Sequence, residues 1–243
     1  MSSAKQDPNS TAALTGSKWV NLYRVGAAAP LITIVFYLCE FLLIPWEKYP
    51  ASTEAWFSLF QESKILGLLY LNALDIFSIA LLGVMFLALY MALRGVNESY
   101  MAIAAFFAFL GVAVFIVPRV AMLSLLPLSD RYAAAATEVE RARLLAAGET
   151  LGALGNPTPQ TIGFLFMAIA VLIISLIMLK SDLFSRITAY LGILASALTF
   201  GDHLSIIMAP ALATALMVIS ALFWIPWWLM ISRGLFQVAR RQE

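Results

Sequence analysis

The sequence predicts an all-α fold, a polytopic membrane bundle of transmembrane helices. Two observations predict it: an apolar composition and long uninterrupted apolar runs. Hydrophobic residues make up 62% of the 243 positions and charged residues only 12%, whereas a soluble domain carries about 25% charged residues. The mean hydropathy of +0.90 agrees. We expect residues 1–243 to form a single membrane domain.

Six apolar runs are long enough to cross a bilayer as helices, which takes about 20 residues each. The first run is too long for a cleaved signal peptide, so we expect it to remain as a span. Only Ala209 and Pro210 separate the last two runs, which predicts an antiparallel hairpin. The six runs are Leu22–Ile44, Ile65–Leu93, Tyr100–Leu126, Thr158–Lys180, Ile187–Met208 and Ala211–Ser232.

The distribution of Lys and Arg near or beyond the ends of the runs predicts the orientation, because cytoplasmic loops of membrane proteins are enriched in these residues. One side would carry Lys5, Lys18, Arg24, Arg94, Lys180, Arg186, Arg233, Arg240 and Arg241, and the other Lys48, Lys64, Arg131, Arg141 and Arg143. Both termini are therefore expected in the cytoplasm, which makes the protein N-in and C-in in a plasma or inner membrane.

Three segments lie outside the runs. Residues 1–17 are polar and are expected to form a disordered cytoplasmic tail. Residues 45–64 should hold a short interfacial helix, capped by Ser52 or Thr53, with its aromatic residues on one face. Residues 129–154 should form an amphipathic surface helix, capped by Ser129 or Asp130, with Glu138–Arg141 and Glu140–Arg143 pairs.

Five ionisable residues interrupt the apolar runs: Glu40, Asp75, Arg119, Asp202 and His203. Charges within the membrane are rare and usually face a bundle interior, a partner charge or water. At 1.5 Å per helical residue all five fall in the outer half of the membrane, at depths of about 6 Å for Glu40 to about 15 Å for Asp75. They are the candidate ligand-binding or proton-handling residues.

Polar neighbours extend these residues into stripes at helical spacing, which add Asn72 to the candidate site. The stripes are Thr33, Tyr37 and Glu40; Asn72, Asp75 and Ser78; and Ser196, Thr199 and His203. Polar groups in hydrocarbon need partners, so the stripes should face one another. The sequence therefore predicts a polar chamber among runs one, two, three and five.

Each charged residue also has a purely structural interpretation. Arg119 could form an ion pair with Asp75 or Asp202, or it could hold an anionic group of a substrate. Glu40 is shallow enough to reach lipid headgroups or water. His203 could act as a general base or a metal ligand, or simply be a hydrogen-bonded side chain at the interface.

No metal site or cofactor is predicted, and no catalytic residue is assigned. The chain has one cysteine, Cys39, and one histidine, so Cys-based metal sites and bis-histidine haem are excluded. Neither an H-E-x-x-H nor a G-x-S-x-G motif is present. The net charge of +1 gives no field that would recruit nucleic acid.

The ends of the runs carry recognisable patterns. Leu89, Tyr90, Arg94 and Asn97 read "L-Y-x-x-L-R-x-V-N", run four ends in "M-L-K-S-D-L-F-S-R", run five contains "Y-L-G-I-L", and the C-terminus reads "W-I-P-W-W-L-M-I-S-R-G-L-F". Together they resemble a family of bacterial six-helix membrane proteins known only as a domain of unknown function. The resemblance implies the topology and a bacterial inner-membrane location, and it implies no activity.

The sequence favours a non-enzymatic protein over an enzyme. The leading hypothesis is that the chamber binds or transports a small polar solute, an ion or a lipid headgroup, with the bilayer as its environment. The first alternative is a membrane-embedded hydrolase, metal-assisted or acid–base, with His203 and two carboxylates at one point. The second is an accessory or structural subunit that binds partner membrane subunits and uses its charges for packing.

Overall fold

A computed structural model describes residues 19–44, 49–154 and 157–243, and within these residues all regular structure is α-helical. The chain divides into two compact units. The terminal unit takes in the chain up to Leu31, Leu81–Ala108 and Ala168–Glu243, and the central unit takes in Ile32–Ala80 and Phe109–Met167. The predicted tail, residues 1–17, lies outside the described residues.

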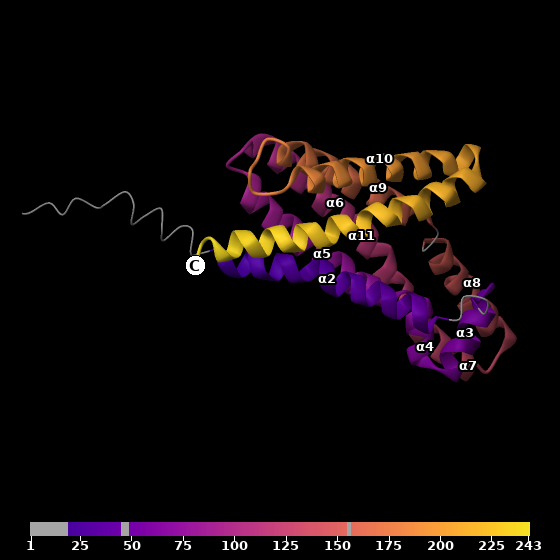
Figure 1. Cartoon of the computed structure of the whole chain (residues 1–243). Coiled ribbons are helices and arrows are strands. Elements are labelled where there is room, and N and C mark those ends of the chain that lie inside the picture. Colours follow the sequence, from indigo (N-terminus) through magenta and orange to yellow (C-terminus); the bar gives the residue numbers. More distant parts are fainter. Residues whose placement is uncertain (1–18, 45–48, 155–156) are drawn as a thin grey trace, which may run out of the picture. The chain divides into compact units, whose positions relative to one another are not determined.

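The helices follow the predicted runs with three differences. The elements are α2 (Val20–Leu43), α3 (Thr53–Glu62), α4 (Lys64–Tyr70), α5 (Ala73–Leu93), α6 (Glu98–Met122), α7 (Leu125–Ala134), α8 (Glu138–Leu154), α9 (Pro157–Met178), α10 (Arg186–Met208) and α11 (Pro210–Arg240) (Figure 1). The second run is broken into α4 and α5, residues 129–154 belong to α7 and α8, and the last helix continues past Ser232 to Arg240.

Within the described residues, five segments are long and apolar enough to cross a membrane, so the chain is a multi-pass membrane protein in contact with the lipid bilayer. These segments are Val20–Leu43, Ala73–Leu93, Glu98–Ala134, Gln160–Met178 and Ala211–Arg240. Helix α10, which carries Arg186, Asp202 and His203, is not among them. The predicted sixth span therefore stays a prediction.

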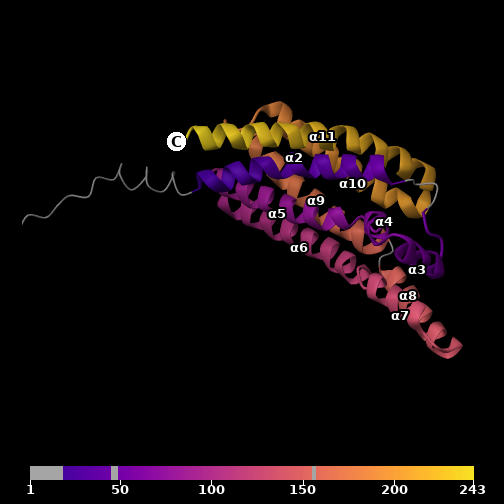
Figure 2. The ribbon, with the colours of Figure 1, turned by 90° about the horizontal axis from the view of Figure 1, so that it is seen from below.

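In the terminal unit, α10 and α11 pack along each other as the predicted hairpin, joined through Ala209 (Figures 1 and 2). A glycine permits close packing in this unit. A Cβ on Gly192 would collide with Ser175 Oγ of α9 and would lie 2.6 Å from Trp227 Nε1 of α11. The fully buried Trp227 ring occupies the space that a larger residue at position 192 would take.

In the central unit, α3, α4, α7 and α8 form what we call the short-helix cluster. Ser52, one of the two predicted caps, begins α3 by accepting a hydrogen bond from the Ala55 N–H at 3.2 Å. Thr137 caps α8 in the same way, accepting from Glu140 N–H at 3.2 Å. The predicted pair Glu138–Arg141 is present at 3.0 Å.

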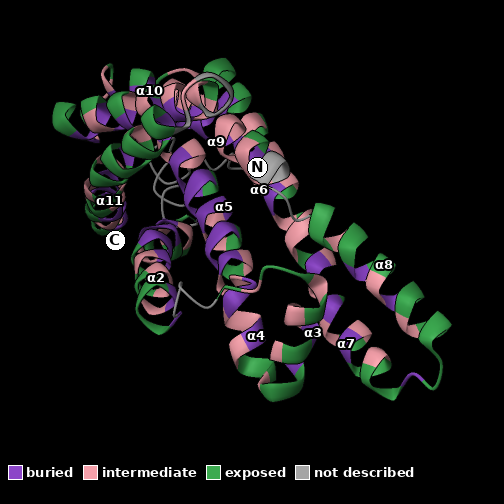
Figure 3. Cartoon of the chain, turned by 90° about the vertical axis from the view of Figure 1, so that its right-hand side faces the viewer, coloured by how far each residue is buried: buried purple, intermediate pink, exposed green. Residues whose placement is uncertain are grey.

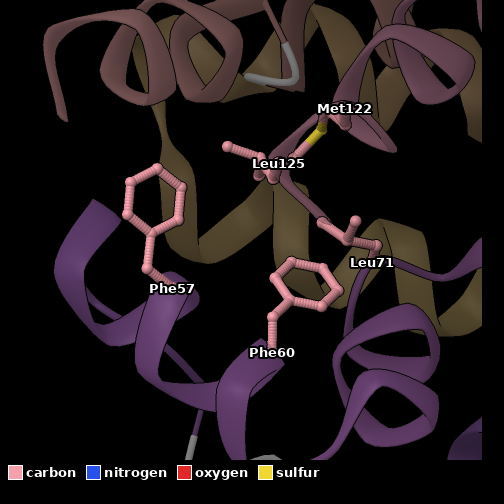
Figure 4. Packing of buried hydrophobic residues seen from close by; sticks show 5 residues of the cluster. All are labelled: Phe57, Phe60, Leu71, Met122 and Leu125. Carbon is pink, nitrogen blue, oxygen red and sulfur yellow. The ribbon is translucent and has the colours of Figure 1, made fainter. Parts of the chain in front are cut away.

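Two sequence predictions for these segments are wrong. Ser129 and Asp130 lie inside α7 and do not cap a helix. The aromatic face of α3 was expected in the membrane interface, but Phe57 and Phe60 are buried in the protein. They form a core with residues at the ends of α4 and α6 and the start of α7: Leu71, Met122 and Leu125 (Figure 4).

Further partly buried apolar side chains pack against these aromatic residues, and removing this apolar surface from water stabilises the short-helix cluster. Helix α8 buries Leu144 and Gly148 and exposes most of its remaining residues (Figure 3). A Cβ on Gly148 would lie 2.5 Å from Thr53 Cγ2 and 2.9 Å from Phe57 Cζ, so glycine allows α8 to approach α3.

Candidate functional site: a charged layer at a broken helix

The second predicted span is interrupted at Leu71 and Asn72, between α4 and α5. Asn72 has φ of 50°, in the left-handed region that asparagine tolerates better than most residues. The Asp75 N–H bonds to Asn72 O at 3.0 Å instead of to Leu71 O, as a continuous helix would require. The Leu71 carbonyl therefore needs another donor.

Arg119 supplies that donor. Its Nη1 donates to Leu71 O at 3.2 Å, and its Nη2 donates to Gln160 Oε1 at 2.8 Å. Nη2 also lies 3.5 Å from Asp75 Oδ2, so the structure contains one of the two ion pairs expected for Arg119. The guanidinium carbon is 5.4 Å from the centre of the Phe115 ring, a cation–π distance. Arg119 thereby joins α4, α5, α6 and α9.

Glu40 of α2 is the third charged residue of the site. We call Glu40, Asp75 and Arg119 the charged layer. Glu40 is only 5% exposed. Its side chain lies near Asp75 and the start of α5. Its Oε1 atom is buried and accepts no hydrogen bond from the described residues. A carboxyl beside a helix N-terminus is stabilised by the unpaired N–H groups of the first turn.

The predicted stripes of the first two runs face each other. Thr33 Oγ1 donates to Ser78 O at 3.3 Å, and the Tyr37 hydroxyl lies among the charges of Asp75, Glu40 and Arg119. Asn72 does not extend this stripe along one helix, because it lies at the break. Its side chain is partly buried, and its Oδ1 atom accepts no hydrogen bond from the described residues.

The charged groups lie about one helical turn from the ends of their helices. Glu40 is three residues before Leu43, Arg119 is three before Met122, and Asp75 is two after Ala73. At 1.5 Å per residue these positions are about 3–5 Å from the helix ends. The predicted depth of about 15 Å for Asp75 was counted from Ile65, whereas α5 begins at Ala73, so Asp75 lies only about 3 Å along its helix.

Gln160 was not among the residues predicted for the site. It is uncharged, and the search for buried charges could not select it. The available signal was its position, since Gln160 is the third residue of the predicted run Thr158–Lys180. The Leu71 carbonyl was also missed, because nothing in an apolar run that contains one asparagine reveals a helix break.

Asp202 and His203 belong to α10 in the terminal unit. Their side chains contact each other through Asp202 Oδ1 and His203 Nδ1, and the same ring nitrogen lies 2.8 Å from Thr199 O. Trp224 Nε1 of α11 donates to Thr199 Oγ1 at 3.0 Å. The expectation that Asp202 and His203 share one chamber with the central unit's residues stays a prediction.

The layer contains two acidic groups and one basic group. If both carboxyls are ionised, it carries one uncompensated negative charge in a buried setting, which strongly favours a bound proton or cation. Among the described residues, no three His, Cys, Asp or Glu side chains are grouped so that they could hold a metal ion.

Comparison with known proteins identifies the family to which the chain belongs. Neither the curated proteins nor the solved structures contain a match to it. One family model does match, and it covers residues 25–234 of the 243. The matched region contains every residue of the charged layer and both members of the Asp202–His203 pair. The chain belongs to the family described as Domain of unknown function (DUF4386).

Proposed function

We propose that this membrane protein binds and transports a small polar solute, and that Glu40, Asp75 and Arg119 form its binding site. The observation that supports the proposal is the burial of Glu40 beside Asp75, with one carboxylate oxygen unpaired among the described residues. A buried acid without its own cation is costly. Such a group within a membrane usually serves an ion or substrate pathway.

The balance of charge favours a cationic ligand. The Arg119 guanidinium already donates to Leu71 O and Gln160 and lies beside Asp75. An anionic group approaching Arg119 would meet two carboxyls. A monovalent cation would instead neutralise the layer. The break between α4 and α5 fits this role, because many transporters place binding sites at interrupted helices.

One alternative is favoured by a specific observation. An accessory subunit that uses its charges for packing would pair Arg119 closely with one acid, and the Asp75–Arg119 pair at 3.5 Å fits that expectation. A packing contact of this kind explains Asp75 and Arg119. It gives no reason for burying a second acid, Glu40, beside them, which is why we favour the binding function.

The test measures the thermal stability of the purified protein in lipid nanodiscs at constant ionic strength. Methylammonium serves as a small monovalent cation and acetate as a small anion. We expect methylammonium to raise the unfolding midpoint and acetate to leave it unchanged, because only a ligand that binds the native state stabilises it. The Glu40→Gln variant should lose this stabilisation.

Glu149→Gln is the matched control, since Glu149 is an exposed acid on α8. It should respond to methylammonium like the unsubstituted protein. Stabilisation by acetate but not by methylammonium would reject the cationic ligand. No response to either ion, with Glu40→Gln more stable than the parent protein, would favour the packing alternative.

The complete topology is also part of the proposal. We infer six spans, with α10 as the fifth, both termini in the cytoplasm and the charged layer towards the outside of a bacterial inner membrane. The excess of Lys and Arg on one side of the runs supports this orientation. Asp202 and His203 would then lie in the same half of the membrane as Glu40 and Arg119.

A further inference from the structure

The short-helix cluster contains a cavity that lies apart from the residues of the charged layer. It is formed by α7, α8 and the turn between them, and it has a volume of about 550 Å³ (Figure 3). Cavities that hold small-molecule ligands measure about 300–1,000 Å³, so this volume suits a molecule larger than one inorganic ion. The polar side chains that line the cavity are Arg131 of α7, Thr137 of the turn, and Glu140 and Arg143 of α8.

Arg131 and Arg143 contribute two guanidinium groups to this cavity. The sequence predicts an ion pair between Glu140 and Arg143, but among the described residues of α8 the ion pair that forms is Glu138–Arg141. Arg131 and Arg143 make no hydrogen bond or ion pair with any residue that the structure describes. A guanidinium has planar donors that match the oxygens of a phosphate group. Both arginines can therefore donate to an oxyanion in the cavity.

Thr137 and Glu140 indicate which oxyanion fits. The Thr137 hydroxyl oxygen accepts a hydrogen bond from the Glu140 N–H at 3.2 Å, so its own O–H can donate to a ligand. The cavity lining contains two arginines and one glutamate, which give it a net charge of +1. A phosphodiester carries one negative charge, whereas a phosphate monoester carries about 1.5–2 at pH 7. The charge of the cavity therefore matches a phosphodiester.

The position of the cavity relative to the bilayer indicates where such a group comes from. Helix α6 has 25 residues, so it is about 38 Å long and exceeds the hydrocarbon thickness of about 30 Å. Helix α7 follows α6 closely along the chain, and it therefore begins at the level of the lipid headgroups. The cavity also has apolar walls, which suit the glycerol and the upper acyl chain of a lipid. These walls are formed by Leu128, Val139 and Leu144.

We propose that the cavity between α7 and α8 binds the phosphodiester headgroup of a phospholipid. Arg131 and Arg143 donate to the phosphate oxygens, and the Thr137 hydroxyl provides a further donor. The site shares no residue with the charged layer, so it does not rest on the proposed solute binding. A lipid in this position holds α8, most of whose residues are exposed, at the membrane surface.

The test is native mass spectrometry of the purified, delipidated protein in detergent, titrated with dioleoylphosphatidylglycerol. We expect the Kd of the tightest-binding lipid to rise about 3–10-fold in Arg143→Gln, because one charge-assisted contact of an exposed arginine is lost. Arg141→Gln is the matched control, since Arg141 is on the same helix, pairs with Glu138 and does not line the cavity. It should bind the lipid like the parent protein. Equal weakening in Arg141→Gln and Arg143→Gln would show that the lipid responds to overall charge alone and would overturn the proposal.

Two further probes separate the parts of the ligand. Dioleoylglycerol has the same acyl chains without the phosphodiester, and we expect it to bind more weakly than the phospholipid and equally to the parent protein and Arg143→Gln. Dimethyl phosphate has the phosphodiester without the chains, and at the same concentration it should not displace the phospholipid. Dioleoylglycerol binding as tight as that of the phospholipid would reject the role of the arginines. Displacement by dimethyl phosphate would identify a site for a free phosphodiester and reject the lipid.

Discussion

Arg119 shows how one side chain can satisfy several structural needs. It replaces the helical hydrogen bond that Leu71 O loses at the break, and it balances Asp75. Sequence reasoning selected Arg119, Asp75 and Glu40 because charged residues stand out in apolar runs. It could not select Gln160, whose importance comes entirely from its contact with Arg119.

Replacing Arg119 should strongly destabilise the protein. We expect Arg119→Gln to lower the free energy of unfolding in SDS by about 3–5 kcal/mol, because removing one partner leaves a buried charge uncompensated. Arg119→Lys should recover only part of this loss, since a single ammonium cannot reproduce the planar donor pattern of a guanidinium. The exposed Arg186 provides the control: Arg186→Gln should stay within about 0.5 kcal/mol of the parent protein. Equal effects at both positions would contradict the role given to Arg119.

At the scale of helices, α6 and α9 approach closely through two glycines of the central unit. A Cβ on Gly111 would lie 2.7 Å from Gly163 O and 2.7 Å from Met167 Cγ. A Cβ on Gly163 would lie 3.0 Å from Gly111 O. Small residues at such contacts let helix backbones come together in membranes. The spacing matters for the site, because α6 carries Arg119 and α9 carries Gln160.

Alanine at Gly111 should therefore separate the two helices. We expect Gly111→Ala to lower the free energy of unfolding by about 1–3 kcal/mol through overpacking. It should also weaken the response to methylammonium, because Arg119 and Gln160 move apart. Gly152→Ala in α8 is the control, since nothing lies within 4 Å of its added Cβ. The measurement is SDS unfolding of both variants, and a Gly111→Ala protein as stable as Gly152→Ala would refute the close contact.

Helices α3, α4 and α7 are joined at the surface by polar contacts around Asp130. Lys64 Nζ donates to Asp130 Oδ2 at 2.8 Å, and Gln61 Nε2 donates to Asp130 Oδ1 at 3.2 Å. The Lys64 and Gln61 hydrogen bonds lower the pKa of Asp130 below its ordinary value of 3.8. A lowered carboxyl pKa stabilises the fold above the ordinary value, and that stabilisation is lost as the pH falls through the lowered pKa.

The pKa of Asp130 can be measured directly by carbon-detected NMR of the carboxyl group. We expect a midpoint below 3.8 in the parent protein and a midpoint closer to 3.8 in Lys64→Met. Amide exchange in α7 should become faster over the same acidic range in the parent protein only. A midpoint that Lys64→Met does not change would show that the ion pair is absent in solution.

The elements also show the limits of sequence reasoning. Apolar runs predicted where α2, α9 and α10 begin and end to within about two residues. They did not predict the breaks at Leu71–Asn72 or between α7 and α8, because neither break carries a glycine or proline signal. Side-chain hydrogen bonds stabilise both breaks. Arg119 donates to the Leu71 carbonyl at the first break, and Thr137 caps the helix that follows the second.

For the whole molecule, the number of membrane crossings depends on α10. Asp182 precedes α10 and Gln242 follows α11, so both helices lie between these two positions. If both helices cross, the two residues are on the same side of the membrane. If α11 alone crosses, they are on opposite sides.

We expect six spans, and single cysteines in a Cys39→Ala background can test this. A membrane-impermeant maleimide should label Glu54→Cys and Glu149→Cys in intact cells. It should label Gly95→Cys, Asp182→Cys and Gln242→Cys only after permeabilisation. Labelling of Gln242→Cys but not of Asp182→Cys in intact cells would show that the number of crossings is odd.

The interruption at Asn72 also matches the chain to the thickness of its lipid environment. Helix α5 has 21 residues, so it is about 31 Å long, close to the hydrocarbon thickness of about 30 Å. A continuous helix from Lys64 to Leu93 would measure about 45 Å and would have to tilt steeply or thicken the bilayer around it. Ending the segment at Asn72 leaves an apolar helix whose length is close to the hydrocarbon thickness.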